Sequence, residues 1–282
     1  MWLRWWVTNQ PKLRTRRPPS DGHSSDMKRA ALSRVGRIDL VDLQAISESL
    51  GRDFLPHPFV VPEPSRFDSY QEYEAYVAAV PERLAHGDLR EFNQWLTSYV
   101  NSDIRVECVV SIVGAPRGRL LAHRHGQTGF LAAQNSAEQC IEVYRVSPYE
   151  LGSAITGSLA LTKPGTHSRI AIPDLVRVSP RDGGHDAVST VLQRDSGRRN
   201  ISIPRSELSR YTRVQSRCQP ARDWGFDRRK NTAACVTIKN DGDYIYAPNF
   251  EYLTPMTPQL LSERIDALIA EDVASLRSLR GR

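Results

Sequence analysis

The sequence predicts an α/β protein of the α+β kind, with a central, mostly antiparallel sheet flanked by helical bundles. Apolar residues recur at helical spacing before Asp103, and from there to Val146 they alternate with a period of two. Near the C-terminus, two short alternating segments are again followed by an amphipathic segment. With 282 residues, 40% of them apolar, the chain can bury a sizeable core.

The segment before Asp103 predicts three helices. Residues 37–41 lead into the first helix, as a short strand or as its first turn, and Gly51 provides a left-handed stop. The following prolines predict an extended connector, because a residue before proline avoids the helical region; they lie at positions 56, 58, 62 and 64.

The second and third helices have recognisable start signals. Ser69 and Glu72 form a capping box for the second helix, and Pro81 predicts a kink or break inside it. Asp88 is expected to cap the third helix, with Glu91 three residues later. The apolar residues of these helices are expected to pack into the core.

From Asp103 the alternation predicts an antiparallel meander of four strands joined by short turns. The strands are expected at 103–111, 120–125, 128–134 and 140–146. In the first strand Arg105 and Glu107 alternate with apolar residues, so one face of that strand is expected to be wetter.

Two strand-then-helix units predict a quasi-twofold internal repeat. A helix with Ser147 as its N-cap follows the meander, and a helix opened by Thr257 follows two strands at 233–239 and 243–247. Both helices fit the pattern [Ser/Thr]-Pro-x-x-Leu-x-x-x-Ile. The alternative is a chance similarity between two capped amphipathic helices.

Residues 177–232 have few periodic apolar positions, so we expect mostly loop there. A short strand at 201–203 and a helix at 206–214 are the exceptions. The basic clusters at 198–199 and 228–230 are interpreted as solvated loop charges, with contact to an acidic partner as the alternative.

Charge is distributed unevenly. Residues 1–37 hold nine Lys or Arg against two Asp, which leaves 29 bases against 30 acids in the remaining 245 residues. A neutral core argues against nucleic acid as its partner. The apolar runs are also too short to span a membrane.

These features divide the chain into a disordered basic tail at 1–36, a single domain at 37–276 and a basic C-terminal tail at 277–282. Translation starting at Met27 is an alternative to a native 1–26 segment.

Catalytic motifs are missing from the sequence. There is no G-x-S-x-G, no G-x-x-x-x-G-K-[ST] and no strand-borne G-x-G-x-x-G. His123 and His125 have a spacing that zinc can use, but no third ligand is identifiable, so surface or partner-facing histidines are favoured. Asp241 to Asp243 resembles the start of a calcium loop and is better interpreted as a hairpin turn.

The four cysteines contain no C-x-x-C pair and are expected to be reduced thiols. We therefore expect neither an enzyme nor a bound metal or cofactor.

Several short motifs occur in a fixed order between residues 36 and 275. They are DLQAISESLG from Asp42, LPHP from Leu55, LAHG from Leu84, DIRV from Asp103, TGFLAAQ from Thr128, VSP from Val146 and TPMTPQLLSERIDALIA from Thr254. In this order and spacing the chain resembles the EspG proteins, the cytosolic chaperones of actinobacterial type VII (ESX) secretion. The central domain is accordingly expected to be EspG-like.

The resemblance implies a non-catalytic cytoplasmic chaperone that binds the apolar helical tip of a PE–PPE heterodimer. The client is thereby kept soluble and ready for secretion. A homodimer of this chain is an alternative assembly that the sequence does not exclude. By position, the resemblance places partner contacts on a loop and on the C-terminal helix, at Gly114, Ala115, Pro116, Arg117, Gly118, Arg119, Leu261, Ile265 and Leu268.

The alternative function is a protein that binds nucleic acid or another anionic surface through its basic N-terminal tail.

Overall fold

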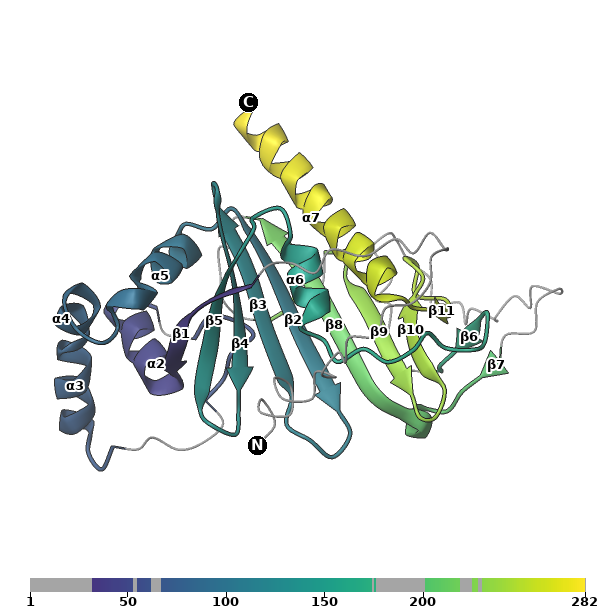
Figure 1. Cartoon of the computed structure of the whole chain (residues 1–282), viewed down its shortest axis with the longest axis horizontal. Coiled ribbons are helices and arrows are strands. Elements are labelled where there is room, and N and C mark those ends of the chain that lie inside the picture. Colours follow the sequence, from purple (N-terminus) through teal and green to yellow (C-terminus); the bar gives the residue numbers. More distant parts are fainter. Residues whose placement is uncertain are drawn as a thin grey trace, which may run out of the picture.

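The computed structural model describes residues 32–52, 55–61, 67–173, 175, 201–218, 225–227 and 230–281. They form one sheet of eleven strands, in the order β1-β5-β4-β3-β2-β8-β9-β10-β11-β6-β7 (Figure 1). Neighbouring strands are antiparallel except β6 and β7, so the predicted mostly antiparallel sheet is confirmed.

The strands are β1 (Ser33–Asp39), β2 (Ile104–Ile112), β3 (Gly118–His125), β4 (Thr128–Asn135), β5 (Cys140–Val146), β6 (Ile170–Ala171), β7 (Ile201–Ser202), β8 (Leu208–Cys218), β9 (Ala233–Ile238), β10 (Gly242–Tyr246) and β11 (Leu253–Pro255). The α-helices are α2 (Leu40–Ser49), α3 (Tyr70–Ala78), α4 (Val80–Ala85), α5 (Asn93–Val100), α6 (Leu151–Gly157) and α7 (Pro258–Arg280). Two short 3-10 helices are η1 (Arg90–Phe92) and η2 (Arg205–Glu207).

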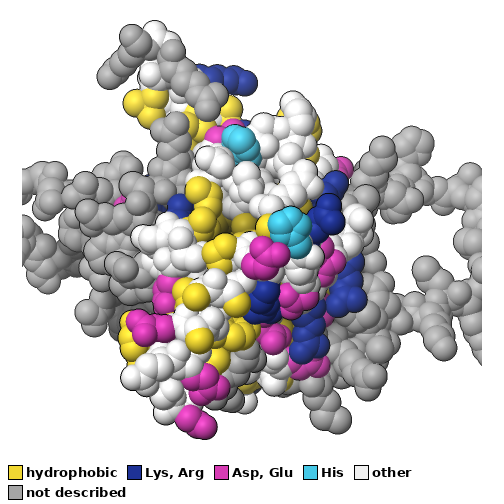
Figure 2. All heavy atoms as spheres, turned by 90° about the vertical axis from the view of Figure 1, so that its left-hand side faces the viewer, with side chains coloured by type: hydrophobic (Ala, Val, Ile, Leu, Met, Phe, Trp, Pro, Cys, Tyr) yellow, Lys and Arg dark blue, Asp and Glu magenta, His cyan; other side chains and the backbone are white. Residues whose placement is uncertain are grey.

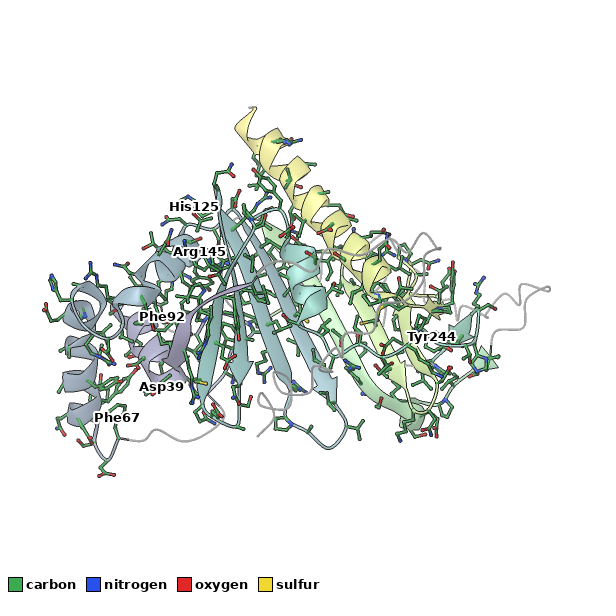
Figure 3. The ribbon with its side chains drawn as sticks, viewed as in Figure 1. Asp39, Phe67, Phe92, His125, Arg145 and Tyr244 are labelled. Atoms are coloured by element: carbon green, nitrogen blue, oxygen red, sulfur yellow. The ribbon has the colours of Figure 1, made fainter. Side chains whose placement is uncertain are left out.

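Helices cover both faces of the sheet (Figure 1). Alternate residues of β3 point to opposite faces, so Leu120 packs with α6 and α7 while Leu121 packs with α2 and α5. A third core cluster lies around Tyr244 of β10, at the other end of the sheet from Phe92 (Figure 3). The predicted helical bundles and the quasi-twofold repeat stay predictions.

Three start and stop signals in the first third of the chain are confirmed. Gly51 has a φ of 70° just after α2, a conformation that glycine adopts without steric cost. The Ser69 hydroxyl accepts a hydrogen bond from the Glu72 backbone N–H at 3.2 Å. The helix breaks before Pro81, which lies in the first turn of α4.

Two predicted helix starts are wrong. Asp88 does not cap a helix, because its carboxylate is held by the Arg83 guanidinium at 2.7 and 2.9 Å, and α5 begins only at Asn93. The helix predicted from Ser147 begins at Leu151 and ends before Leu159, which is nevertheless buried. At Asp88 the contact with Arg83 replaces the expected cap.

The helix predicted at 206–214 is also wrong, because these residues belong largely to β8. This strand lies between β2 and β9 in the middle of the sheet. Thr212, Val214 and Ser216 are buried on the face that carries α7. In the sequence, polar side chains at the alternating buried positions of β8 conceal the period of two that is typical of a strand. The strand expected at 201–203 is confirmed as β7.

The wetter face expected for β2 is wrong at two positions. Arg105 and Glu107 are almost completely buried. The Arg105 guanidinium donates hydrogen bonds to Tyr99 and to the Ser102 hydroxyl, and it lies 3.8 Å from the centre of the Tyr99 ring. Both charges are therefore satisfied by protein groups instead of by water.

Residues 241–243 lie in the β9–β10 hairpin, so the interpretation as a hairpin turn instead of a calcium loop is confirmed. The hairpin also holds in place the part of the chain that follows α6. The Asp241 carboxylate accepts hydrogen bonds from the Thr166 backbone N–H and hydroxyl, at 2.9 and 2.7 Å. Asp243 is buried and accepts a hydrogen bond from the Thr162 backbone N–H. The hairpin and the segment 162–166 thereby approach each other closely.

Replacing Gly242 by alanine is expected to lower the free energy of unfolding by about 1–3 kcal/mol. A Cβ there would lie 2.5 Å from the Lys163 carbonyl oxygen and 2.8 Å from the Gly165 backbone nitrogen. Urea unfolding measures the loss. Gly157→Ala is the control, because a Cβ at Gly157 meets no heavy atom within 4 Å. An equal loss in both variants would show that the close approach is not the cause.

Candidate partner-binding surface

The β2–β3 hairpin exposes an apolar side chain at its tip. Val113 is 71% exposed, although its backbone N–H is fixed by a hydrogen bond to the Ser209 carbonyl at 3.1 Å. Gly114 follows with a φ of 74°, which turns the chain. Pro116 and Arg117 are also exposed. The backbone thus holds the tip while its side chains stay in solvent.

Positive charge surrounds this tip. Arg117 and Arg119 form no ion pair with any residue that the structure describes. Burial, with the Arg117 cation adding to it, lowers the pKa of Arg119. In the sheet register Val109 lies between Arg119 and Arg213, so these two side chains share one face. A partner with apolar and anionic groups would complement this surface.

A buried ionic cluster lies two residues along β2 on that face. The Glu107 side chain is 1% exposed; its Oε1 lies 3.2 Å from Arg217 Nη1 and its Oε2 lies 3.1 Å from His57 Nδ1. The Phe226 ring packs edge-on against His57, with 5.3 Å between ring centres, and stacks under Arg213 at 4.5 Å. The cluster joins β2 and β8 to the two connecting segments that contain His57 and Phe226.

The three α7 residues expected to contact a partner are core residues. Leu261, Ile265 and Leu268 are buried with α6 and the sheet, because their spacing places them on the helix face that packs inward. This part of the site prediction is corrected. The neighbouring Leu260, 38% exposed, is accessible on the same helix.

The hairpin tip and α7 do not form one continuous surface. Figure 1 shows the β2–β3 connection at the lower end of the sheet and α7 across its upper half.

The Thr257 hydroxyl caps α7 by accepting a hydrogen bond from the Leu260 N–H at 3.1 Å, as the sequence predicted. The loop Gly114, Ala115, Pro116, Arg117, Gly118 and Arg119 remains the predicted contact region. The signal for Val113 was available in the sequence: an apolar residue at a strand end, directly before glycine.

The two histidines of the H-x-H pattern have different environments. His123 is fully buried between the Tyr99 and Phe130 rings, contrary to the expected surface position, whereas His125 is exposed. Among the described residues, no group of three or more His, Cys, Asp or Glu is placed to hold a metal ion.

The basic clusters of the sequence lie mostly outside the described residues. These positions are 198–199 and 228–229. Lys230 is described, and it is not a solvated loop charge: it contacts the buried Asp272 carboxylate of α7, which also accepts a hydrogen bond from Ser216 at 2.6 Å. The four cysteines are free thiols, as expected.

The end of the molecule formed by α3 and α4 has a mixed surface. Figure 2 shows apolar side chains there interspersed with acidic and basic ones. Tyr70 is 72% exposed at the start of α3. In the described part of the chain, no helix has the length and apolar character needed to cross a membrane.

Fold and surface together define the class: an α/β protein built on one long, mostly antiparallel sheet, with an apolar, positively charged hairpin exposed at one end. The chain belongs to the EspG family, the ESX secretion-associated family that its motifs resemble, because the sequence model of the EspG family matches residues 39–233. No curated protein matches the chain.

Among solved structures, the chain is similar to one described as the Mycobacterium tuberculosis type VII secretion system chaperone EspG5 in complex with the PE25–PPE41 dimer. The sequences are 11% identical, the match covers 83% of this chain and 95% of that chain, and the TM-score is 0.47.

Proposed function

We propose that this chain is a cytosolic chaperone of type VII secretion that binds a PE–PPE heterodimer and covers its apolar helical tip. Membership of the EspG family carries the proposal, since the family match runs from the end of β1 to the start of β9. A covered tip keeps the client soluble, because large apolar patches left in water promote aggregation.

The β2–β3 hairpin is the proposed contact. Its apolar tip, Val113 and Pro116, can be buried against an apolar helix, at about 25 cal/mol per Å² of apolar area removed from water. Arg117 and Arg119 beside it supply cations without an ion-pair partner among the described residues. Such charges favour encounter with the correct partner more than they raise affinity.

Co-expression with the PE–PPE pair encoded nearby is expected to give a stable complex on size-exclusion chromatography. The complex should persist when the chain starts at Met27, because the proposed contact lies in the folded part. Failure to form a complex with any PE–PPE pair would overturn the proposal. Binding that needs residues 1–26 and falls steeply with salt would instead support the anionic-surface alternative.

Val113→Asp is expected to weaken the complex at least about tenfold, because a carboxylate at the tip must be desolvated on binding. Isothermal titration calorimetry with the purified heterodimer measures the change. Tyr70→Asp, equally exposed but on α3, is the matched control and should bind as the wild type does. The same affinity for Val113→Asp and wild type would remove the hairpin from the interface.

A further inference from the structure

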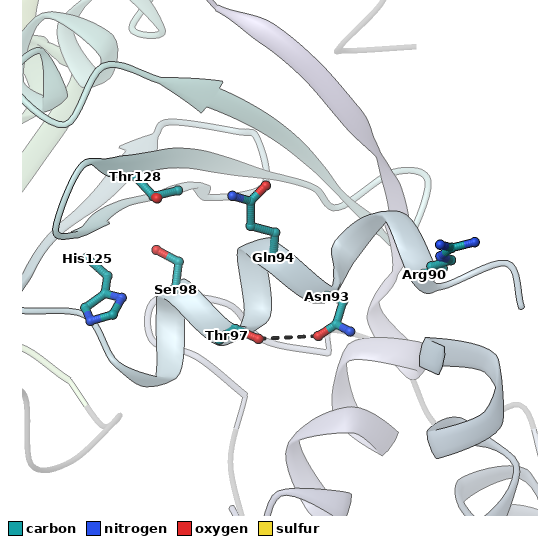
Figure 4. Close-up of a pocket in the computed structure, with 7 residues that line it drawn as sticks. All are labelled: Arg90, Asn93, Gln94, Thr97, Ser98, His125 and Thr128. Carbon is teal, nitrogen blue, oxygen red and sulfur yellow. Dashed lines mark hydrogen bonds between the residues drawn. The ribbon is translucent and has the colours of Figure 1, made fainter. Parts of the chain in front are cut away.

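A groove lies between α5 and the β3–β4 hairpin, away from the β2–β3 hairpin. Its volume is about 560 Å³, which is within the range of small-ligand sites. Seven residues line it: Arg90, Asn93, Gln94, Thr97, Ser98, His125 and Thr128. In Figure 4 the side chains of Gln94 and Ser98 point from the helix towards the hairpin. His125 and Arg145 lie at this same end of the sheet (Figure 3).

Every lining side chain is polar, and none is a carboxylate. Ser98 is 4% exposed, yet its hydroxyl has no hydrogen-bond partner among the described residues. A buried hydroxyl without a partner is costly, so a ligand that supplies one is favoured. Thr97 donates a hydrogen bond to Asn93 Oδ1 at 3.3 Å, which restrains that amide (Figure 4).

The arginines and the hydrogen-bonding groups around the groove favour an anionic ligand. Arg90 and His125 are exposed at its rim, and Arg145 donates a hydrogen bond to Gln94 Oε1. Two acids close in sequence to the groove do not line it: Asp103 lies 3.6 Å from Arg124, and the Glu91 carboxylate lies against Gly36 of β1.

The shape and the hydrogen-bonding groups favour a peptide. The side-chain amides of Asn93 and Gln94 each carry an NH2 donor, and each carbonyl oxygen, which already accepts one hydrogen bond from Thr97 or Arg145, keeps a second lone pair. Each amide can therefore still pair with a peptide group. From Arg90 to Ser98 the helical segment rises roughly 12 Å at 1.5 Å per residue. An extended peptide of about four residues covers that distance at 3.3 Å per residue.

We propose that this groove binds a short, extended acidic peptide through its side-chain amides and hydroxyls, with the peptide carboxylates near Arg90 and His125. The site is separate from the proposed client contact and does not rest on it.

The test is an NMR titration of the full-length, ¹⁵N-labelled protein with acetyl-Asp-Ala-Gly-Asp-amide. Saturable shifts are expected in the segments 90–98 and 125–128, with a Kd on the order of 0.1–1 mM. The matched neutral peptide, acetyl-Asn-Ala-Gly-Asn-amide, is expected to bind at least about fivefold more weakly because it lacks charge-assisted hydrogen bonds.

Variants locate the site. Arg90→Gln is expected to weaken binding of the acidic peptide about tenfold, and Ser98→Ala is expected to weaken it about threefold. Arg277→Gln, an exposed arginine of α7, is the control and should not change the affinity. No saturation up to about 10 mM would overturn the proposal, as would equal binding of the neutral peptide. The same saturating shifts with inorganic phosphate alone would show that the groove is a simple anion site and would overturn the proposal that it binds a peptide.

Discussion

Replacing Glu107 by leucine is expected to lower the free energy of unfolding by about 3–5 kcal/mol. The Glu107 carboxylate is buried and is shared by Arg217 and His57. Its removal takes a buried carboxylate away from the Arg217 guanidinium, which is 12% exposed and therefore poorly solvated. Equilibrium unfolding in urea measures the loss. The cluster joins β2 to β8, so the loss should appear as a lower midpoint of the cooperative transition.

A surface ion pair gives the matched control. Arg37 and Glu138 also form a salt bridge, but both side chains are well exposed. Glu138→Gln is therefore expected to change the free energy of unfolding by less than about 1 kcal/mol.

A double variant separates the charge effect from lost packing. Glu107→Leu combined with Arg217→Met removes both charges, so the double variant should be more stable than the sum of the single losses implies. Strict additivity would show that the ion pair is not what stabilises this position.

The second large effect concerns acid stability and His123. Burial first, and the nearby Arg105 cation second, lower the pKa of His123 to about 3. In the unfolded chain the imidazole titrates near 6.5. Between these values the unfolded state binds the proton and the folded state does not, so stability present above about pH 6.5 is lost as the pH falls towards 3.

His123→Leu is expected to remove this loss. Relative to pH 7, the wild type should lose about 2 kcal/mol more than the variant at pH 5, because each pKa unit corresponds to about 1.4 kcal/mol. Urea unfolding at pH 7, 6 and 5 measures the difference. His125→Leu, two residues along the same strand but exposed, should retain the wild-type pH dependence. Parallel pH profiles for the wild type and His123→Leu would contradict this account.

Local signals in the sequence predicted much of the first half of the fold. The meander from β2 to β5 followed from alternation with a period of two, and the break near Pro81 followed from the missing N–H of proline. The caps at Ser69 and Thr257 were read from side chains within three residues of the N–H groups that they accept.

The candidate contact region was predicted only in part. The position of the hairpin followed from the alternation, and the resemblance assigned it a role. The direction of the α7 residues was missed, since a helical stripe of leucine and isoleucine fits a core and an interface equally well. The groove beside α5 gave no sequence signal, because its residues come from η1, α5, β3 and β4, which meet only in the fold.

The sequence by itself determined most of the local elements up to Val146 and, through the order of its motifs, the family. Only the tertiary structure decided that β8 lies at the centre of the sheet and that Glu107, Arg105 and His123 are buried. The physical reason is distance along the chain. Propensity and capping act over about four residues, whereas Glu107 meets Arg217 110 residues away. Which face of a strand is covered is fixed by such contacts, and the pattern of one strand does not contain them.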